Sequence, residues 1–241
     1  EAAGRDCDFV VTTIFVNPTQ FGPGEDFDRY PRTLEEDLRL CAEAGADLVF
    51  TPDVSEMYPA DSQTTIHVSE LTRTLEGALR PGHFDGVTTI VAKLFLVTEP
   101  DRAYFGQKDY QQQLIIRQMT SDLKFGTQIV TCPIIRENDG LAMSSRNRYL
   151  SAGQRRAATE ISQALKLAEQ LAATPDRTPS QISDLMRQHL ESTGAFEVQY
   201  AIVADCETLQ LLTERQPSAV ALIAAKLGTT RLIDNQILQF R

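Results

Sequence analysis

A glycine turn between an apolar segment and a polar helix start is the first feature that could do chemistry. Residues 105–109 read Phe-Gly-Gln-Lys-Asp. Where a strand turns through glycine into a helix, backbone N–H groups and the positive end of the helix dipole attract phosphate. Lys108 would add a point charge there. The alternative is a purely structural turn in which Asp109 caps the helix and Lys108 is solvated.

A second candidate phosphate site is the polar loop at residues 136–148, Arg-Glu-Asn-Asp-Gly-Leu-Ala-Met-Ser-Ser-Arg-Asn-Arg. The hydroxyls of Ser144 and Ser145 and the guanidinium of Arg146 can follow phosphoryl oxygens as charge moves to a leaving group. The composition therefore predicts a mobile phosphate clamp. A solvated linker is the alternative interpretation of the same loop.

Neutral amides follow an apolar strand near the start of the chain. Residues 15–26 read Phe-Val-Asn-Pro-Thr-Gln-Phe-Gly-Pro-Gly-Glu-Asp, with amides and glycines before any charge. Gln20, and Gln112 or Gln113 one turn beyond Asp109, could bind hydroxyls and a carboxylate, since an amide offers two donors and an acceptor without a fixed charge. Because glutamine is seldom buried, a plain surface position is the favoured interpretation of each of them taken singly.

A basic loop precedes another expected helix. Residues 80–86 read Arg-Pro-Gly-His-Phe-Asp-Gly, which makes Arg80 and His83 candidates for contact with an anion. The alternative is that Pro-Gly separates two helices and His83 caps one of them.

Charge and composition exclude several classes of protein. The 241 residues carry a formal net charge of -10 with a pI near 4.8, so we expect no nucleic-acid partner. There is no run of eighteen apolar residues, and the opening residues lack the apolar core of a signal peptide, so we expect no membrane span. The four cysteines are scattered without a C-x-x-C pair, which favours a reducing cytoplasm.

Several common motifs are absent from the sequence. Residues 22–27, Gly-Pro-Gly-Glu-Asp-Phe, begin like a dinucleotide fingerprint but have Phe27 in place of the third glycine. There is no Walker phosphate loop, no H-E-x-x-H and no G-x-S-x-G. The three histidines, His67, His83 and His189, are too dispersed for zinc, so we expect no protein metal site.

The elements that must position these residues alternate between strands and helices. Strands are expected at residues 8–16, 46–51, 64–68, 102–105 and 128–132, with helices at 33–45, through 71–79, from 86 onward and at 110–119. Thr33 and Glu36 have the spacing of a capping box. This alternation predicts a doubly wound parallel α/β sheet, whose ligands bind beyond the carboxyl ends of the strands. The polar clusters after Val16, Phe105 and Cys132 are therefore expected to face one crevice.

The pattern changes after residue 132. Helices at residues 152–173 and 179–192 precede strands at 198–203 and 219–225. We expect an α/β ligand-binding domain at residues 1–132 and a smaller C-terminal α+β domain at residues 133–241.

Four sequence blocks in order resemble the pantothenate synthetase family. They are FVNPTQF at 15–21, RPGHFDGV at 80–87, FGQKDYQQ at 105–112 and DGLAMSSRN at 139–147. Residues 232–235 look like the family's closing strand. The resemblance implies a Rossmann-like nucleotidyltransferase fold, with residues 1–132 binding ATP and pantoate and residues 133–241 forming a lid.

The resemblance implies the ATP-dependent condensation of pantoate with β-alanine. In the family, the pantoate carboxylate attacks the α-phosphate of ATP to give pantoyl adenylate and pyrophosphate, and the amine of β-alanine then displaces AMP. ATP with Mg²⁺, a homodimer and a cytoplasmic location are implied as well. Neutral amides around pantoate would leave its carboxylate free to react, whereas a lysine would pair with it.

The resemblance also implies roles for single residues. The candidates for substrate binding are Asn17, Gln20, Tyr30, Arg80, His83 and Gln112. Those for ATP binding are Gly106, Gln107, Lys108, Asp109, Ile135, Met143, Ser144, Ser145 and Arg146, with Ile135 against adenine and residues 143–146 as the moving phosphate loop. Lys108, Ser144, Ser145 and Arg146 are the catalytic candidates.

One family feature is not found in these 241 residues. The family begins with a strand, a Pro-Thr-Met-Gly stretch and an H-x-G-H helix start that contacts ATP, and the sequence contains no such pattern. We expect the chain to begin within the family's first helix, which would cost the sheet a strand and expose a hydrophobic edge. Two functions stay open: the ligase, or a non-catalytic chain that binds ATP or pantoate.

Overall fold

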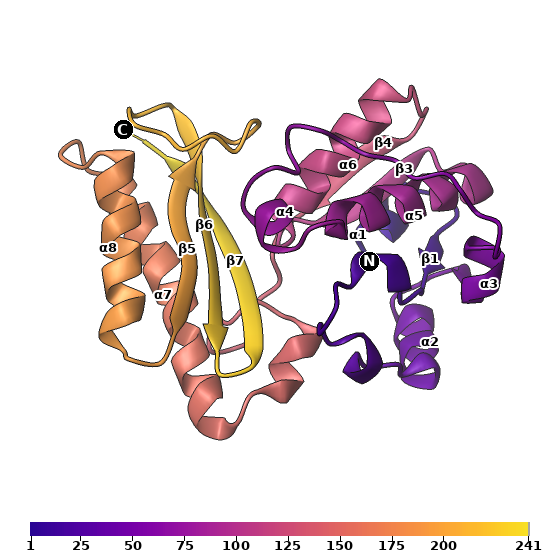
Figure 1. Ribbon diagram of the computed structural model, residues 1–241, viewed down its shortest axis with the longest axis horizontal. Coiled ribbons are helices and arrows are strands. Elements are labelled where there is room, and N and C mark those ends of the chain that lie inside the picture. Colours follow the sequence, from indigo (N-terminus) through magenta and orange to yellow (C-terminus); the bar gives the residue numbers. More distant parts are fainter. Residues whose placement is uncertain (241) are drawn as a thin grey trace. The chain divides into compact units, whose positions relative to one another are not determined.

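The computed structural model describes residues 1–240, which divide into two compact units (Figure 1). The first unit contains residues 1–105 and 111–132. The second contains the Gly106–Tyr110 turn together with the chain from residue 133 onward. The turn therefore belongs to the second unit, although both segments that flank it in the chain belong to the first.

Short strands and connecting helices form the framework of the first unit. β1 (Val11–Thr13) and β2 (Leu48–Phe50) pair in parallel, and β3 (Arg102–Gly106) pairs with β4 (Gln128–Cys132). A parallel pair needs a crossover connection, which α2 (Leu34–Glu43) supplies between β1 and β2. The predicted mixed α/β class with parallel strands is confirmed. Over residues 1–240, these four strands pair two by two and not as one continuous sheet.

Two predicted strands are shorter than expected. The segment 8–16 is a strand only at Val11–Thr13, and 46–51 only at Leu48–Phe50. Leu48 is 50% exposed, so the apolar composition of β2 does not bury the whole strand. After residues 14–17 the chain enters the 3-10 turn η1 (Pro18–Gln20), which begins at Pro18, where the missing N–H is tolerated.

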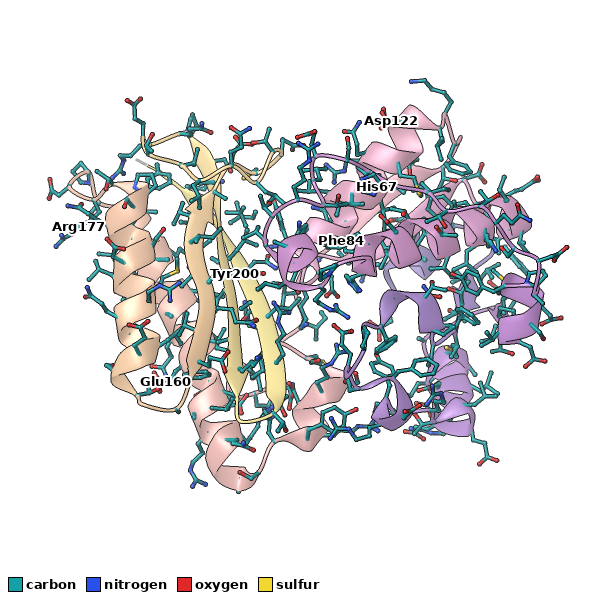
Figure 2. The ribbon with its side chains drawn as sticks, in the orientation of Figure 1. His67, Phe84, Asp122, Glu160, Arg177 and Tyr200 are labelled. Atoms are coloured by element: carbon teal, nitrogen blue, oxygen red, sulfur yellow. The ribbon has the colours of Figure 1, made fainter. Side chains whose placement is uncertain are left out.

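Two long helices supply the core of the first unit. α5 (His83–Thr98) and α6 (Tyr110–Asp122) lie close to their predicted positions. Phe84 at the start of α5 is 3% exposed (Figure 2), and Ile115 and Ile116 of α6 are fully buried. The short helices of this unit are α1 (Ala2–Asp6), η2 (Phe27–Arg29), α3 (Val54–Met57) and α4 (Glu76–Leu79).

The strand predicted at residues 64–68 is wrong. The segment is irregular, and its Ile66 backbone is held by side chains of α5. Ile66 N–H donates to Thr89 Oγ1 at 3.0 Å, and Thr88 Oγ1 donates to Ile66 O at 2.6 Å. Two helix hydroxyls therefore satisfy the backbone groups that a neighbouring strand would otherwise pair.

The helix predicted through residues 71–79 is also wrong in its first half. Only Glu76–Leu79 is helical, and Leu75 has a φ of 53°. The buried side chain of Gln111 explains the break: its amide nitrogen donates to Leu71 O at 2.6 Å and to Thr74 O at 2.9 Å, and its oxygen accepts from Glu76 N. A long-range amide thus takes backbone groups that a continuous helix would use.

The capping box predicted at Thr33 is not formed. The Thr33 hydroxyl donates to Asp37 Oδ1 at 3.2 Å and caps no backbone N–H of α2. Gly45, with φ 83°, follows the helix as expected for a residue after its C-cap.

Strong local signals fix the helices of the second unit. α7 (Ala152–Ala172) and α8 (Pro179–Ser192) each begin with a capping box, formed by Ser151 with Gln154 and by Thr178 with Gln181. α8 also has proline at its first position, where the missing N–H costs nothing. Both helices match their predicted ranges closely.

A three-stranded antiparallel sheet completes the second unit. β5 (Glu197–Ala204), β6 (Ser218–Leu227) and β7 (Thr230–Gln239) follow one another in space as in the sequence, and α7 and α8 pack against them (Figure 1). Gly228, with φ 63°, begins the two-residue turn between β6 and β7. The predicted strands are confirmed, and the structure shows that they pair in an antiparallel sheet.

None of the helices described over residues 1–240 combines the length and the apolar character that crossing a bilayer requires.

A glycine allows the backbone of η1 to approach α5 in the first unit. A Cβ added to Gly86 would lie 2.5 Å from Thr19 O and 2.7 Å from Gln20 N. Gly86 O in turn accepts a hydrogen bond from Asn17 Nδ2 at 3.0 Å. Residues 17–20 can therefore occupy their position only because position 86 has no side chain.

We predict that Gly86→Ala displaces η1 and lowers the free energy of unfolding by about 1–3 kcal/mol, the usual cost of overpacking. Gly153→Ala is the matched control, because nothing lies within 4 Å of a Cβ added at this position in the first turn of α7. It should raise stability by up to about 1 kcal/mol through the better helix propensity of alanine. Denaturant titration of both variants checks this. Equal stability of the two would show that the close approach is not tight.

Candidate active site

In the first unit, Asn17 holds the turn that presents Gln20. Asn17 is 2% exposed, and its Nδ2 donates to Gly86 O at 3.0 Å and to Gln20 Oε1 at 3.2 Å. Its Oδ1 accepts from Thr19 N and from Thr19 Oγ1. The Asn17 amide is therefore engaged in hydrogen bonds within the protein. Gln20 is half-buried, and its amide nitrogen takes part in none of these hydrogen bonds.

Arg80 lies beside the same turn and is paired with Glu25. The guanidinium donates through Nε and NH2 to the two Glu25 oxygens, each at 2.6 Å, in a bidentate ion pair. A third contact reaches Gln20 O at 3.4 Å. Burial alone would raise the pKa of Glu25, but the hydrogen bonds and charge of Arg80 outweigh it and lower that pKa. An external anion would have to compete with this carboxylate for Arg80.

His83 connects Arg80 to the backbone of Gln20. Its Nδ1 lies 2.8 Å from Gln20 O and donates to it, while Nε2 lies 3.0 Å from an Arg80 nitrogen and accepts from it. This pattern requires a neutral imidazole. Burial lowers the pKa of His83 and the Arg80 charge lowers it further, against the opposing effect of the Gln20 carbonyl. The sequence candidates Asn17, Gln20, Arg80 and His83 thus form one hydrogen-bonded cluster.

The two remaining first-unit candidates lie on other elements. Gln112 is half-buried on α6 between Gln111 and Gln113, which are both buried. Gln111 binds backbone groups, and Gln113 accepts from Thr131 Oγ1 at 3.1 Å. Of the three glutamines, Gln112 is therefore the one not committed to the core. The ring of Tyr30 packs edge-on against Phe21, the residue after Gln20, at 5.8 Å between centroids.

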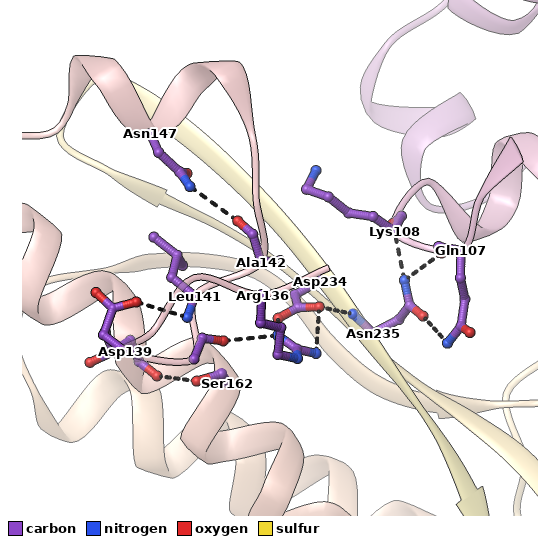
Figure 3. Close-up of polar contacts among 12 residues, drawn as sticks. Gln107, Lys108, Arg136, Asp139, Leu141, Ala142, Asn147, Ser162, Asp234 and Asn235 are labelled. Carbon is purple, nitrogen blue, oxygen red and sulfur yellow. Dashed lines mark hydrogen bonds and ion pairs between the residues drawn. The ribbon is translucent and has the colours of Figure 1, made fainter. Parts of the chain in front are cut away.

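In the second unit, a buried asparagine holds the glycine turn. Asn235 on β7 is 1% exposed. Its Nδ2 donates to Gln107 O at 2.9 Å and to Lys108 O at 3.0 Å, and its Oδ1 accepts from Gln107 Nε2 at 3.1 Å (Figure 3). One amide thus satisfies two consecutive carbonyls and a side chain. Figure 3 shows the Lys108 side chain extending away from these contacts.

An ion pair supports Asn235 from the neighbouring position. Asp234, which is 3% exposed, accepts from Arg136 NH1 at 2.6 Å and from NH2 at 3.1 Å. Asp234 Oδ1 also accepts from Asn235 N–H at 2.8 Å. Arg136 additionally donates to Gly140 O at 3.1 Å. The glycine turn and the polar loop are therefore joined through β7.

The polar loop is a folded hairpin in its first part. Arg136 bridges to Ala142, and Gly140, with φ 91°, makes the turn between them. Met143 N donates to Ile135 O at 2.9 Å, so these two residues are neighbours. Their side chains are 65% exposed for Ile135 and 55% for Met143. Two adjacent exposed apolar side chains suit the face of a flat apolar ligand.

A hollow of about 480 Å³ opens beside this hairpin, lined by Arg136, Glu137, Asn138, Asp139, Met143 and Arg155. Arg155 donates to Glu137 at 2.8 Å and to Asp139 at 2.6 Å. Hydrogen bonds from Asn147 and Arg155 lower the pKa of Glu137. Because two carboxylates neutralise Arg155, its role is to fix the hairpin.

The catalytic candidates of the loop lie at the start of η3 (Ser145–Tyr149). Ser144 is the N-cap of this 3-10 helix, and its Oγ accepts from Arg146 N at 3.3 Å. Asn147 donates to Glu137 and to Ala142 O. Its Oδ1 is buried and is, over residues 1–240, without a hydrogen-bond partner. Such an orphaned acceptor costs about 1–3 kcal/mol.

No group of three or more His, Cys, Asp or Glu side chains within residues 1–240 is arranged to hold a metal ion. All four cysteines are free thiols.

Sequence reasoning missed the residues that support the site. Glu25, Gly86, Arg136 and Asp234 act through long-range pairing that local patterns do not report. For Asn235 one signal existed, since it ends the Leu-Ile-Asp-Asn block at 232–235 that looks like the family's closing strand.

Comparison with known proteins identifies the family. The model of the pantoate-beta-alanine ligase family matches residues 1–237. The pantothenate synthetase of Thermoanaerobacter sp. (strain X514) is 52% identical over 233 residues, which cover 97% of this chain and 82% of that protein.

Solved structures agree with the sequence comparison. A crystal structure of pantothenate synthetase from Thermus thermophilus aligns with a TM-score of 0.94 at 45% identity, covering 98% of this chain and 85% of the other. A structure of pantoate-beta-alanine ligase from Francisella tularensis, complexed with beta-gamma ATP and beta-alanine, aligns with a TM-score of 0.78 at 31% identity. It covers 98% of this chain and 82% of the other. The chain therefore belongs to the pantoate-beta-alanine ligase family.

Proposed function

We propose that this chain catalyses the ATP-dependent condensation of pantoate with β-alanine. Its membership of the ligase family over residues 1–237 is the observation that carries the proposal. The pantoate carboxylate displaces pyrophosphate from the α-phosphorus of ATP, and the amine of β-alanine then displaces AMP from the mixed anhydride. Adenylation is needed because a free carboxylate is a poor acyl donor.

The first unit supplies the proposed pantoate contacts. Gln20 and Gln112 bind its hydroxyls and carboxylate, and Tyr30 lines the same pocket. Asn17 acts indirectly, because its amide is occupied by Gly86, Thr19 and Gln20 itself. Arg80 and His83 contribute in the same way, by fixing the backbone of Gln20.

The second unit supplies the proposed ATP contacts. Gly106, Gln107, Lys108 and Asp109 bind the phosphates, and the exposed pair Ile135 and Met143 contacts adenine. Lys108, Ser144, Ser145 and Arg146 stabilise the charge that develops on the leaving pyrophosphate.

Mg²⁺ enters this proposal as a companion of ATP. Residues 1–240 provide no carboxylate cluster for the ion, so phosphate oxygens and water would be its main ligands. Its chemistry is to neutralise charge on the phosphates.

We further propose that the protein is a cytoplasmic homodimer. We also propose that the first unit of each chain derives from a doubly wound, Rossmann-like sheet. The free cysteines support a reducing compartment, and the parallel pairing of β1 with β2 supports the sheet class. Light scattering after size exclusion measures the mass; the mass of one chain, 26.8 kDa, would contradict the dimer.

The direct test is an assay of this chain with ATP, Mg²⁺ and pantoate. Pyrophosphate should be released, and addition of β-alanine should yield AMP and pantothenate in equal amounts. Binding of ATP or pantoate by calorimetry without release of pyrophosphate would identify a chain that binds without reacting, and would overturn the proposal.

We predict that Lys108→Gln reduces the rate of pyrophosphate release by about 10²–10³-fold, the range for loss of one charge-stabilising group. Lys226→Gln is the matched control, because it removes the same charge from β6 of the same unit, where Lys226 pairs with Glu197. The control should keep its rate within about twofold, since exposed ion pairs contribute little. Comparable losses in both variants would point to net charge and not to a phosphate contact.

We predict that Gln20→Lys raises the KM for pantoate and slows adenylation, because an ammonium at this position would pair with the reacting carboxylate. Steady-state kinetics with varied pantoate measures the change. Gln118→Lys, at an exposed position on α6 of the same unit, makes the same change of charge and should be nearly silent. Full adenylation activity in Gln20→Lys would contradict the assigned role.

Acidification should weaken the cluster around His83. The pKa of His83 is lowered in the folded protein, so the unfolded chain binds the proton more tightly, and stability falls as the pH drops below about the ordinary value of 6.5. The pKa of Glu25 is lowered from 4.5, so the stability that this carboxylate contributes is lost only at lower pH. Between pH 7 and 5, wild type should therefore lose more unfolding free energy than His83→Asn. Parallel pH profiles of the two proteins would contradict this.

A further inference from the structure

We propose that Asn235 is a positioning residue for ATP: its side chain sets the conformation of the Gln107–Lys108 turn that receives the nucleotide phosphates. The inference rests on the proposed function and goes beyond it, since Asn235 lies on β7, 127 positions along the chain from Lys108. Figure 3 shows Asn235 between Asp234 and the turn, with its side chain directed at Gln107 and Lys108.

The side-chain amide of Asn235 fits the turn completely. Its nitrogen carries two hydrogens, which match the carbonyls of Gln107 at 2.9 Å and Lys108 at 3.0 Å. Its oxygen matches the Gln107 amide at 3.1 Å. With 1% exposure, the side chain has little access to water as an alternative partner. Of the standard side chains of this size, only asparagine offers two donors and an acceptor in one plane.

These contacts determine where the turn can bind an anion. In a trans peptide, the N–H points opposite to the C=O of the same plane. Because Asn235 binds the Gln107 carbonyl, the N–H of Lys108 must point away from β7. The N–H of Asp109 is already directed at Gly106 O, at 3.3 Å. The Lys108 N–H is thus a donor that the turn presents on the side away from Asn235, and Figure 3 shows the Lys108 side chain extending away from the same contacts.

Asp234 and Arg136 connect Asn235 to the polar loop by further hydrogen bonds. Asp234 Oδ1 binds the backbone N–H of Asn235, while Arg136 binds both carboxylate oxygens. Arg136 starts the hairpin that carries Ile135 and Met143. A shift of the turn therefore disturbs the hairpin through two hydrogen-bonded steps, so phosphate and adenine contacts would be set together.

The test is Asn235→Asp, which keeps the shape of the side chain and replaces its two donors with an oxygen. A carboxylate oxygen would face two carbonyl oxygens, so the turn must open. The KM for ATP should rise by about tenfold or more, the factor that about 1.4 kcal/mol represents, while the KM for pantoate should stay within about twofold. Gln239→Glu is the matched control, because it makes the same amide-to-acid change at an exposed site of β7.

A pH series separates positioning from general damage. When the introduced carboxyl is protonated it regains one donor, so the ratio of variant to wild-type KM for ATP should shrink as the pH is lowered from 8 toward 5.5. A merely structural defect would give a ratio that does not change with pH. A constant ratio, or equal increases in the KM values of ATP and pantoate, would overturn the proposal.

A readout without turnover keeps the inference separate from the proposed function. The backbone amide resonances of residues 106–109 should shift in Asn235→Asp and stay unchanged in Gln239→Glu, in ¹⁵N spectra of the protein without nucleotide. Unchanged resonances in Asn235→Asp would refute the positioning role whether or not the wild type is active. If the resonances shift in Asn235→Asp but the wild type has no ligase activity, the positioning of the turn is established and only the ligase activity is refuted.

Discussion

A carbonyl group that is removed from water must find a donor, and this constraint shapes one candidate turn in each unit. Asn17 is 2% exposed and Asn235 is 1% exposed, and each donates its amide hydrogens to backbone carbonyls or to the turn that it supports. Leaving one such group unpaired costs about 1–3 kcal/mol. A buried amide therefore determines the backbone from which Gln20 or Lys108 extends.

Three arginines near the candidate turns are paired with carboxylates of the protein itself. Arg80, Arg136 and Arg155 donate to Glu25, Asp234 and the pair Glu137 with Asp139. Breaking a buried pair by removing one partner usually costs roughly 3–5 kcal/mol, because the other charge stays behind. Asp234 is the most deeply buried of these carboxylates. We therefore interpret these guanidiniums as structural groups that hold the turns and the hairpin in place.

The turns that carry the candidate residues could be predicted from the sequence, because the residue types that form a turn lie within the turn itself. Gly-Gln-Lys-Asp before a helix, and Asn-Pro-Thr-Gln after a strand, state both the backbone geometry and the polar groups available. The long helices α5, α6, α7 and α8 were predictable for a similar reason, since periodicity and caps lie within the element. The capping boxes at Ser151 and Thr178 show how complete such a local signal can be.

Other features depend on partners that are distant in sequence. The helix expected through residues 71–79 does not form in its first half, because Gln111 binds the backbone there. Gln111 is at least 35 positions from each backbone group that it binds. The strand expected at 64–68 does not form, because hydroxyls of α5 bind its backbone. Propensity is a weak prior, and one buried amide with three partners outweighs it. A prediction from local pattern therefore fails where a side chain from another element takes the backbone hydrogen bonds.

The sheet of the second unit explains why a turn can depend on a strand 127 positions away. Asp234 pairs with Ile223 and Asn235 with Leu222 of β6, a strand that is buried along almost its whole length. Elements with many buried contacts open last, whereas loops open first. A phosphate-binding turn fixed only by its own residues would move with the loops. Anchored through Asn235 to the β6–β7 pair, the Gln107–Lys108 turn shares the rigidity of the sheet, which holds the backbone of Lys108 in place.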